Sequence, residues 1–164
     1  MLVVKRSVTI DDLELLFEWR NSSSALSVSR SSLKIDRLEH EKWFRERLKK
    51  IPSEPFWIMI ADNLRVGYVR LDLFDKKENY FTVSIFIVED FQGLGIARKM
   101  LRIALTDFDL PKGHPKFRAV IRKDNFRSIK LFSSVGFFFN SEIDELFDEY
   151  CLSVRDLKLD ALHL

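Results

Sequence analysis

The segment that most constrains the fold is a strand, a glycine-containing turn and a helix over residues 80–108. Apolar residues at every second position predict a strand over residues 80–88. Apolar residues three and four apart predict a helix from Ile96 to about residue 108. Gly93 and Gly95, two of the five glycines in the chain, fall between them. Such a turn lets a ligand approach the backbone and directs free N–H groups at one spot, which favours an anion such as a pyrophosphate.

This turn matches neither of two common phosphate-binding motifs. It lacks the spacing G-x-G-x-x-G of the dinucleotide fingerprint, and no Gly-Lys-Ser/Thr follows, as a P-loop would require. The turn instead reads Gln92-x-x-Gly95-x-Ala97. An ordinary strand-to-helix turn has the same apolar pattern, so this segment alone leaves both a ligand-binding and a purely structural interpretation open.

Length and composition predict one globular domain over residues 1–164, with 46% hydrophobic and 32% charged residues. The net charge of +2 is too small to indicate nucleic acid as the main partner. The lone cysteine, Cys151, excludes an internal disulfide and predicts no metal cluster, which is consistent with a reducing cytoplasm. No apolar run reaches the roughly 18 residues that span a bilayer, so we expect no membrane insertion.

Periodicity and capping residues predict the other elements. Strands are predicted at residues 2–10, 56–61, 65–74, 80–88, 117–122, 137–139 and 147–154, and helices at residues 11–19, 36–50, 96–108 and 125–135. Asp36 is a predicted N-cap, and Gly136 suits a left-handed C-cap. Residues 22–24 and the Ser-rich residues 27–34 are expected as loops, the latter over a site. This alternation of strands and helices predicts an α/β fold, a mixed sheet with helices on both faces.

Two blocks of the sequence resemble the GNAT N-acetyltransferases. The turn Gln92-x-x-Gly95-x-Ala97 is similar to their acetyl-coenzyme A motif, Gln/Arg-x-x-Gly-x-Gly/Ala. The second block is a strand, Asn125, a helix and then Gly136-Phe137, which resembles the other half of a GNAT cofactor site. The resemblance implies the GNAT fold, with a mixed, mostly antiparallel sheet of about seven strands and helices on both faces. It also implies acetyl-CoA as co-substrate and no metal.

The resemblance also assigns cofactor contacts. In GNAT domains a backbone N–H at the end of the central strand binds the thioester carbonyl oxygen, the amides of the glycine turn hold the pyrophosphate, and the asparagine approaches the pantetheine arm. The corresponding residues here are Ile85, Ile87, Val88, Gln92, Gly93, Leu94, Gly95, Ile96, Ala97, Arg98 and Asn125.

A third block resembles a subgroup of bacterial GNAT enzymes that acetylate amino-sugar nucleotides for surface polysaccharides, including the pseudaminic and legionaminic acid pathways. It consists of residues 19–21, residues 40–44 and residues 66–72. The resemblance implies an amino-sugar acceptor, nucleotide-linked as in a UDP-amino sugar. It also implies that Arg20, Asn21 and Arg70 bind the substrate, and a guanidinium fork suits a diphosphate.

The sequence departs from the family pattern at three places. Phe132 stands where many GNAT enzymes have a tyrosine that acts as general acid for the leaving thiolate. Glu89 replaces a frequent proline before the turn, and Ala25 and Leu26 stand where an arginine is common. These departures leave the catalytic acid and part of the substrate pocket unassigned.

Two residues are candidate general bases, His40 and Glu78. Histidine has an unperturbed pKa of about 6.5, which suits proton transfer near neutral pH. The alternative roles are a hydrogen-bonded structural histidine for His40 and a solvated turn residue for Glu78. A lysine amine, with a pKa of about 10.4, needs a strong base, whereas a sugar amine is closer to about 7.7–8.0. This difference favours the sugar acceptor.

Two other functions remain open at this stage. The same fold would serve for acetylation of a protein N-terminus, a lysine or a drug amine. With Phe132 in place of tyrosine, the domain would alternatively bind coenzyme A without turnover. The sequence leaves the oligomeric state open, a homodimer included.

Overall fold

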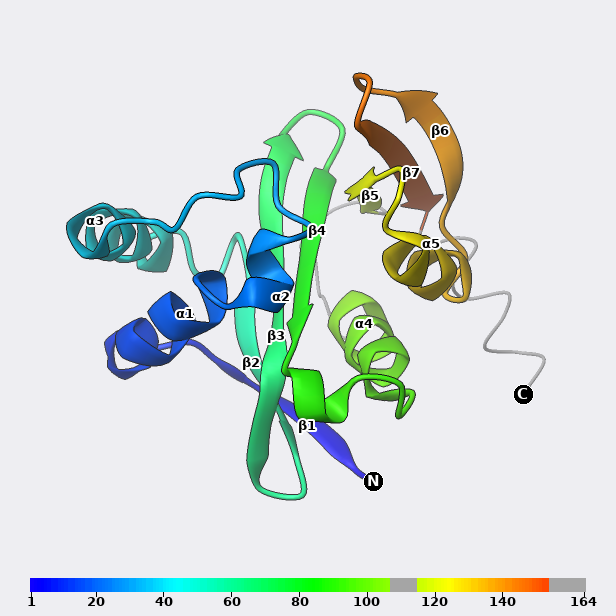
Figure 1. Ribbon diagram of the computed structural model, residues 1–164. Helices are drawn as coiled ribbons and strands as arrows, with labels where there is room; N and C mark the ends of the chain where they lie inside the picture. The colour runs from blue at the N-terminus through cyan, green and yellow to red at the C-terminus, as the bar shows by residue number, and fades with distance from the viewer. Residues whose placement is uncertain (107–114, 154–164) are drawn as a thin grey trace.

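Seven strands form one sheet in the order β1-β2-β3-β4-β5-β7-β6 in the computed structural model, which describes residues 1–106 and 115–153 (Figure 1). The strands are β1 (Val3–Ser7), β2 (Phe56–Ala61), β3 (Leu64–Asp75), β4 (Tyr80–Ile87), β5 (Lys116–Arg122), β6 (Phe138–Glu142) and β7 (Phe147–Ser153). The helices are α1 (Leu13–Arg20), α2 (Ser23–Leu26), α3 (Arg37–Leu48), α4 (Ile96–Thr106) and α5 (Phe126–Ser133), with 3-10 turns η1 (Ile10–Asp12) and η2 (Glu89–Phe91). The predicted fold class and order of the main elements are confirmed.

One predicted loop contains a short helix. The expected loop at residues 22–24 is partly helical, because the Ser22 hydroxyl accepts a hydrogen bond from the Ala25 N–H and caps α2. The predicted ends of a helix at residue 108 and of a strand at residue 154 lie outside the described residues.

The sheet separates two apolar clusters, as expected when strand side chains alternate between faces. On one face, Phe56 and Ile58 of β2 pack with residues of α1 and α3. On the other face, Trp57 and Met59 of β2 belong to the cluster that includes α4 and α5. Helices therefore cover both faces, with α1 and α3 on the opposite side of the sheet from α4 and α5 (Figure 1).

Local capping fixes the predicted helix ends. The Asp36 carboxylate accepts hydrogen bonds from two amides in the first turn of α3. After α5, Gly136 has a φ of +98° and the Phe137 N–H donates to the Phe132 carbonyl over 3.1 Å. This is the hydrogen-bond pattern of a Schellman C-cap, which needs a residue that tolerates left-handed backbone.

Strands β4 and β5 are the parallel pair of the sheet, and they part soon after they meet. Their ladder joins only residues 80–82 of β4 to residues 116–118 of β5. The Val88 N–H donates to the Val66 carbonyl of β3 over 2.9 Å. Since backbone groups alternate sides along a strand, those of Ile85 and Ile87 face away from β3, where β5 no longer follows. Among the described residues, no strand therefore pairs with this side of β4 beyond Thr82, and the N–H groups of Ile85 and Ile87 have no strand partner.

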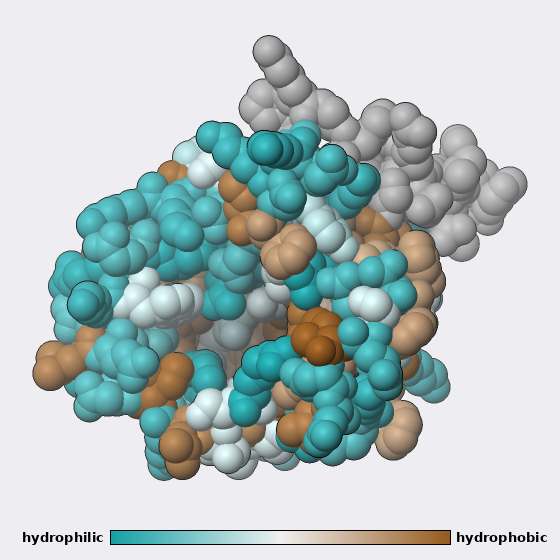
Figure 2. Space-filling view, turned by 90° about the horizontal axis from the view of Figure 1, so that it is seen from above, coloured by the Kyte–Doolittle hydropathy of each residue, from teal (hydrophilic) through white to brown (hydrophobic). Residues whose placement is uncertain are grey.

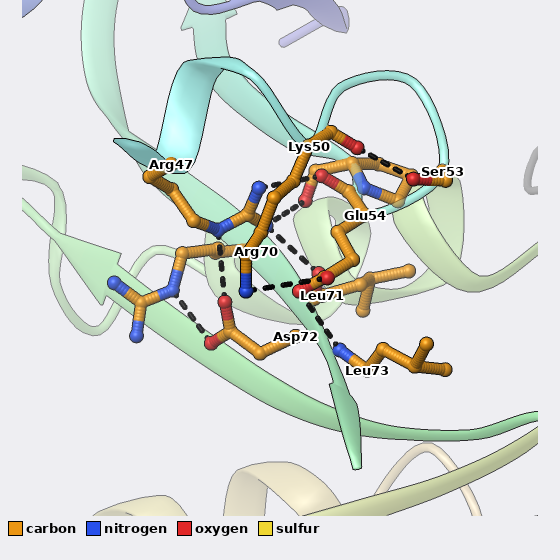
Figure 3. Close-up of polar contacts among 9 residues, drawn as sticks. Arg47, Lys50, Ser53, Glu54, Arg70, Leu71, Asp72 and Leu73 are labelled. Atoms are coloured by element: carbon orange, nitrogen blue, oxygen red, sulfur yellow. Dashed lines mark hydrogen bonds and ion pairs between the residues drawn. The ribbon is translucent and has the colours of Figure 1, made fainter. Parts of the chain in front are cut away.

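A buried arginine joins α3 to the sheet (Figure 3). Arg47 is 4% exposed, and its guanidinium donates to the carbonyls of Glu54 (2.8 Å), Pro55 (3.3 Å) and Leu71 (2.9 Å). Its Nε also donates to the Asp72 carboxylate over 2.9 Å. A buried cation is tolerable only with such partners, so this cluster fixes the end of α3 against β3.

The surface seen in Figure 2 is mostly hydrophilic, with apolar side chains in scattered groups and a hollow near its centre. Among residues 1–106 and 115–153, no helix has the length and hydropathy that crossing a bilayer requires.

Replacing the buried arginine should destabilise the protein strongly. We expect Arg47→Met to lower the free energy of unfolding by about 3–5 kcal/mol, because three carbonyls lose a buried donor and Asp72 loses a partner. The matched control is Arg45→Met on the same helix, where the arginine is exposed and pairs with Glu41 at i−4. Its cost should stay within about 0.5 kcal/mol. Denaturant unfolding of both variants measures the difference, and equal losses would contradict this role for Arg47.

Candidate active site

The glycine turn before α4 has the backbone geometry of an anion site. Gly93 and Gly95 have φ values of +78° and +74°, and a Cβ at either position would meet nothing within 4 Å. The glycines are therefore required by backbone conformation, and open space lies beside them. The first intrahelical bond of α4 runs from the Lys99 N–H to the Gly95 carbonyl, so the N–H groups of the preceding helical residues have no intrahelical acceptor. Such a helix N-terminus favours an anion.

Two arginines lie where the helix dipole disfavours cations. Arg98 is in the first turn of α4 and Arg127 in the first turn of α5, and neither turn contains an acidic residue. The Gln92 side chain links the two regions, because its Nε2 donates to the Ile87 carbonyl (3.3 Å) and its Oε1 accepts from Arg127. Arg127 was not singled out from the sequence, although it falls in the first turn of a predicted helix, where the dipole disfavours a cation unless an anion lies nearby.

Asn125 lies between β5 and α5 as predicted. Its Oδ1 accepts a hydrogen bond from the Ser128 N–H over 3.1 Å, which makes it the N-cap of α5. This bond uses the oxygen and leaves the amide NH2 group as a donor. The predicted cofactor residues thus occupy the unpaired end of β4, the glycine turn with the start of α4, and the start of α5.

A separate cavity of about 250 Å³ lies between α1, α3 and the sheet. Its lining residues come from α1, α3, β2, β3 and the loop before α3: Leu16, Arg20, Ile35, Glu39, His40, Trp43, Phe56, Tyr68 and Arg70. The ring of Tyr68 stacks on Phe86 of β4 at 5.7 Å between centroids. Tyr68 in the cavity wall therefore contacts β4, the strand whose edge toward β5 is unpaired beyond Thr82.

His40 of α3 is 3% exposed and contacts the rings of Phe17, Trp43 and Phe44. Burial lowers its pKa below the usual 6.5, and the positive charge of Arg20 lowers it further, while a hydrogen bond to the Leu13 backbone opposes the shift. Its Nε2 is buried without a partner among the described residues, so Nδ1 is the atom that serves Leu13. The imidazole is neutral at pH 7 and offers a free Nε2 lone pair.

The three predicted substrate residues differ in their surroundings. Arg20 and Arg70 both line the cavity. Asn21 does not line it, since its amide is bonded to the Ile35 backbone, with Nδ2 donating to the carbonyl (3.1 Å) and Oδ1 accepting from the N–H (2.8 Å). Because Ile35 is a wall residue, Asn21 positions the wall of the cavity.

Glu78 lies at the opposite end of β4 from Ile87. It is exposed in the turn before β4 and pairs with Lys116 over 2.7 Å. The length of β4 separates that turn from Ile87, roughly 23 Å at the usual strand rise. This placement argues against Glu78 as a base, because a base must reach the reacting amine.

Two further observations limit the chemistry. Phe132 is 3% exposed and packs edge-on against Phe137 at 4.9 Å, so a core ring occupies the position of the family's acidic tyrosine. Within residues 1–106 and 115–153, no three His, Cys, Asp or Glu side chains gather as a metal site.

Two curated relatives share part of the sequence. An uncharacterized protein of Methanocaldococcus jannaschii is 30% identical over 143 residues, which cover 82% of this chain and 28% of that protein. A prophage-derived uncharacterized N-acetyltransferase of Bacillus subtilis is 28% identical over 96 residues, 58% of this chain and 54% of that protein. The chain therefore spans only about a quarter to a half of the length of these relatives.

Two solved structures share the fold over nearly their whole length. A domain from M. jannaschii matches with a TM-score of 0.80 and 25% identity, covering 93% of this chain and 98% of that one. Spermidine N-acetyltransferase from Vibrio cholerae, solved with CoA and spermine, matches with a TM-score of 0.83 and 17% identity, covering 95% and 98%. Residues 3–138 match the family described as the acetyltransferase (GNAT) domain. The chain therefore belongs to the GNAT acetyltransferase domain family.

Proposed function

We propose that this protein is an acetyl-CoA-dependent N-acetyltransferase that acetylates the amine of a small acceptor. The observation that carries the proposal is that two sites meet at β4. The first is the glycine turn with its free amides, beside the unpaired edge of the strand. The second is the cavity that contains the buried, neutral His40, whose wall residue Tyr68 contacts β4. Two bound reactants held in this way replace a bimolecular encounter, which supplies much of a rate enhancement.

The residues around the glycine turn would hold the cofactor. The backbone amides of Gly93 to Arg98 suit a pyrophosphate. Arg127, which donates to Gln92, would add a positive charge to that of Arg98. The Asn125 amide would donate to the pantetheine arm. When bound, acetyl-CoA supplies an acetyl thioester that an amine attacks directly. The N–H groups on the unpaired side of β4, at Ile85 and Ile87, are placed to stabilise the oxygen that becomes negative.

His40 is the proposed general base. His40 lines the cavity, and its buried Nε2 is unprotonated at pH 7, so it would accept the proton that the attacking amine loses. A sugar amine with a pKa near 7.7–8.0 is already partly neutral, and its proton needs only a weak base. We assign no protein acid to the leaving thiolate, because Phe132 has no hydroxyl and a thiol is acidic enough, with a pKa of about 8.5 for cysteine, that its thiolate can leave without prior protonation.

The acceptor that we propose is an amino sugar and, more specifically, one that is linked to a nucleotide. Support comes from the resemblance of residues 19–21, 40–44 and 66–72, and from the aromatic walls Trp43 and Tyr68, against which the apolar face of a sugar ring can pack. Neighbours in fold accept other amines, such as the spermine bound by the V. cholerae enzyme. An acceptor screen with UDP-amino sugars, peptides, polyamines and aminoglycosides tests the proposal. Turnover of peptides alone would favour a protein acceptor, and CoA binding without any turnover would favour a non-catalytic module.

Gly95→Ala should weaken coenzyme A binding by at least about 10-fold while the protein stays folded. The methyl group would enter the open space beside the turn, and the left-handed backbone would be strained by about 1 kcal/mol. Gly136→Ala is the control, because it also places a methyl group on a left-handed backbone, at the far end of α5, where the methyl would meet the Leu152 side chain at 3.2 Å instead of open space. Calorimetric titration with coenzyme A should give wild-type affinity for the control. Equal affinity in both variants would contradict the assignment of the turn.

His40→Asn should lower kcat by roughly 100- to 10,000-fold, since asparagine can still donate to Leu13 but cannot accept a proton. The lowered pKa of His40 places its protonation below pH 6.5, so base catalysis is present above that pKa and lost as the pH falls through it. The acceptor amine contributes its own dependence near pH 8 in both proteins.

The pH profile separates these two groups. In the wild type, the logarithm of kcat/KM against pH should steepen from a slope of one to two below the His40 pKa, whereas the variant should keep a slope of one. Unchanged coenzyme A affinity would show that the variant is folded. If the slope of two at low pH persisted in His40→Asn, His40 would be excluded as the base.

A further inference from the structure

We infer that the cavity holds an anionic group of the acceptor between Arg20 and Arg70, an inference that rests on the proposed function for the identity of the reacting amine. The two guanidinium groups come from α1 and β3 and line the same cavity of about 250 Å³. Guanidinium groups bind the oxygens of phosphate and carboxylate in pairs. The recognised chemistry is therefore an oxyanion at a short distance from the amine.

Arg70 is held with its terminal nitrogens free. Its Nε donates to the Asp72 carboxylate over 2.8 Å, and its guanidinium lies 5.1 Å from the ring centroid of Trp43 and 5.8 Å from that of Phe56. In Figure 3 the two terminal nitrogens point away from Asp72. No acceptor among the described residues engages them, so an orientation fixed by one carboxylate and two rings leaves two donors for a ligand.

The local charge is not neutralised by Asp72. The same carboxylate also pairs with buried Arg47, whose three nitrogens each donate to protein oxygens. Nearby, Lys50 pairs with Glu54 over 3.4 Å. Three cations thus share two carboxylates in this cluster, and of these three only Arg70 is among the residues that line the cavity. A surplus positive charge at a partly enclosed site favours an anionic ligand.

Arg20 supplies the second donor. Its Nη1 is buried and has no partner among the described residues. A buried donor without an acceptor is costly, and an oxygen atom of a ligand would remove that cost. Arg20 is also close enough to His40 to lower the pKa of the imidazole. The anion would therefore lie within reach of the proposed base, so a single small acceptor can carry both the anion and the amine.

The acidic lining residue is Glu39, on the exposed side of α3. Water screens its charge, so it does not cancel the two arginines, and it can attract the ammonium end of the acceptor before proton loss. An acceptor with an amine at one end and an oxyanion at the other matches this arrangement. A polycation such as spermine would meet like charges at Arg20 and Arg70.

Matched acceptors test the inference. Glucosamine, glucosamine 6-phosphate and UDP-glucosamine differ in their anionic groups, and kcat/KM should be at least roughly 10-fold higher for one of the two phosphorylated sugars. The sugar that gains distinguishes a monophosphate from a nucleotide diphosphate as the source. Equal kcat/KM for all three would overturn the inference.

Arginine variants locate the effect. Arg70→Gln and Arg20→Gln should each lower kcat/KM for the favoured phosphorylated sugar by roughly 10- to 100-fold, mainly through KM. The loss with glucosamine should be at least about 10-fold smaller. Arg70→Gln should fold, because Asp72 keeps Arg47 as its partner. Arg45→Gln, an exposed arginine of α3, is the control and should change neither value. Equal losses for the phosphorylated sugar and for glucosamine would overturn the inference.

Calorimetry separates this inference from the proposed function. Titration with UDP and with inorganic phosphate, in the absence of acetyl-CoA, should show binding of at least one that weakens in Arg70→Gln but not in Arg45→Gln. Binding without acetylation of any amine would leave the anion site standing and remove the proposed reaction. Acetylation of amines, with no such binding and no preference for phosphorylated sugars, would leave the proposed reaction standing and remove the anion site.

Discussion

The parting of β4 and β5 is the feature on which the rest of the arrangement depends. The two strands pair over only three residues each, and the backbone of β4 beyond Thr82 is left with an unpaired side. Unpaired backbone groups away from water are costly, so such an edge persists where a ligand can complete it. The glycine turn and α4 follow this edge directly in the chain, and α5 follows β5. One interruption of the ladder therefore brings unpaired strand groups, free helix amides and Asn125 to the same region.

The opposite face of the sheet depends on a buried ion pair. Arg47 joins the last turn of α3 to Asp72 and to two backbone carbonyls, one just before β2 (Glu54) and one within β3 (Leu71). That attachment fixes α3 over the sheet, and α3 carries His40 to the cavity wall. Asp72 has a second role, since its other oxygen orients Arg70. A structural ion pair and a ligand-facing arginine thus share one carboxylate.

Local signals accounted for the elements and their ends, because caps and periodicity act over a few residues. Asp36 and Gly136 ended or began helices where expected, and Asn125 capped α5. The short helix α2 was missed, since its serines are typical of loops and only the Ser22 cap signals a helix. Side-chain roles were harder to predict. Asn21 and Glu78 are committed to Ile35 and Lys116, contacts between residues distant in sequence that no local pattern contains.

The sequence by itself determined the strand-turn-helix around Gly93 and Gly95, because a left-handed backbone restricts the residue type at those positions. It also supplied the candidate residues of both sites. Only the tertiary structure decided which charges are free to act. Arg47 and Arg70 are equivalent in composition, yet one is saturated by protein oxygens and the other has open donors beside a cavity. Charge pairing depends on distances between elements far apart in the chain, and so does the neutral state of His40, which burial and Arg20 impose.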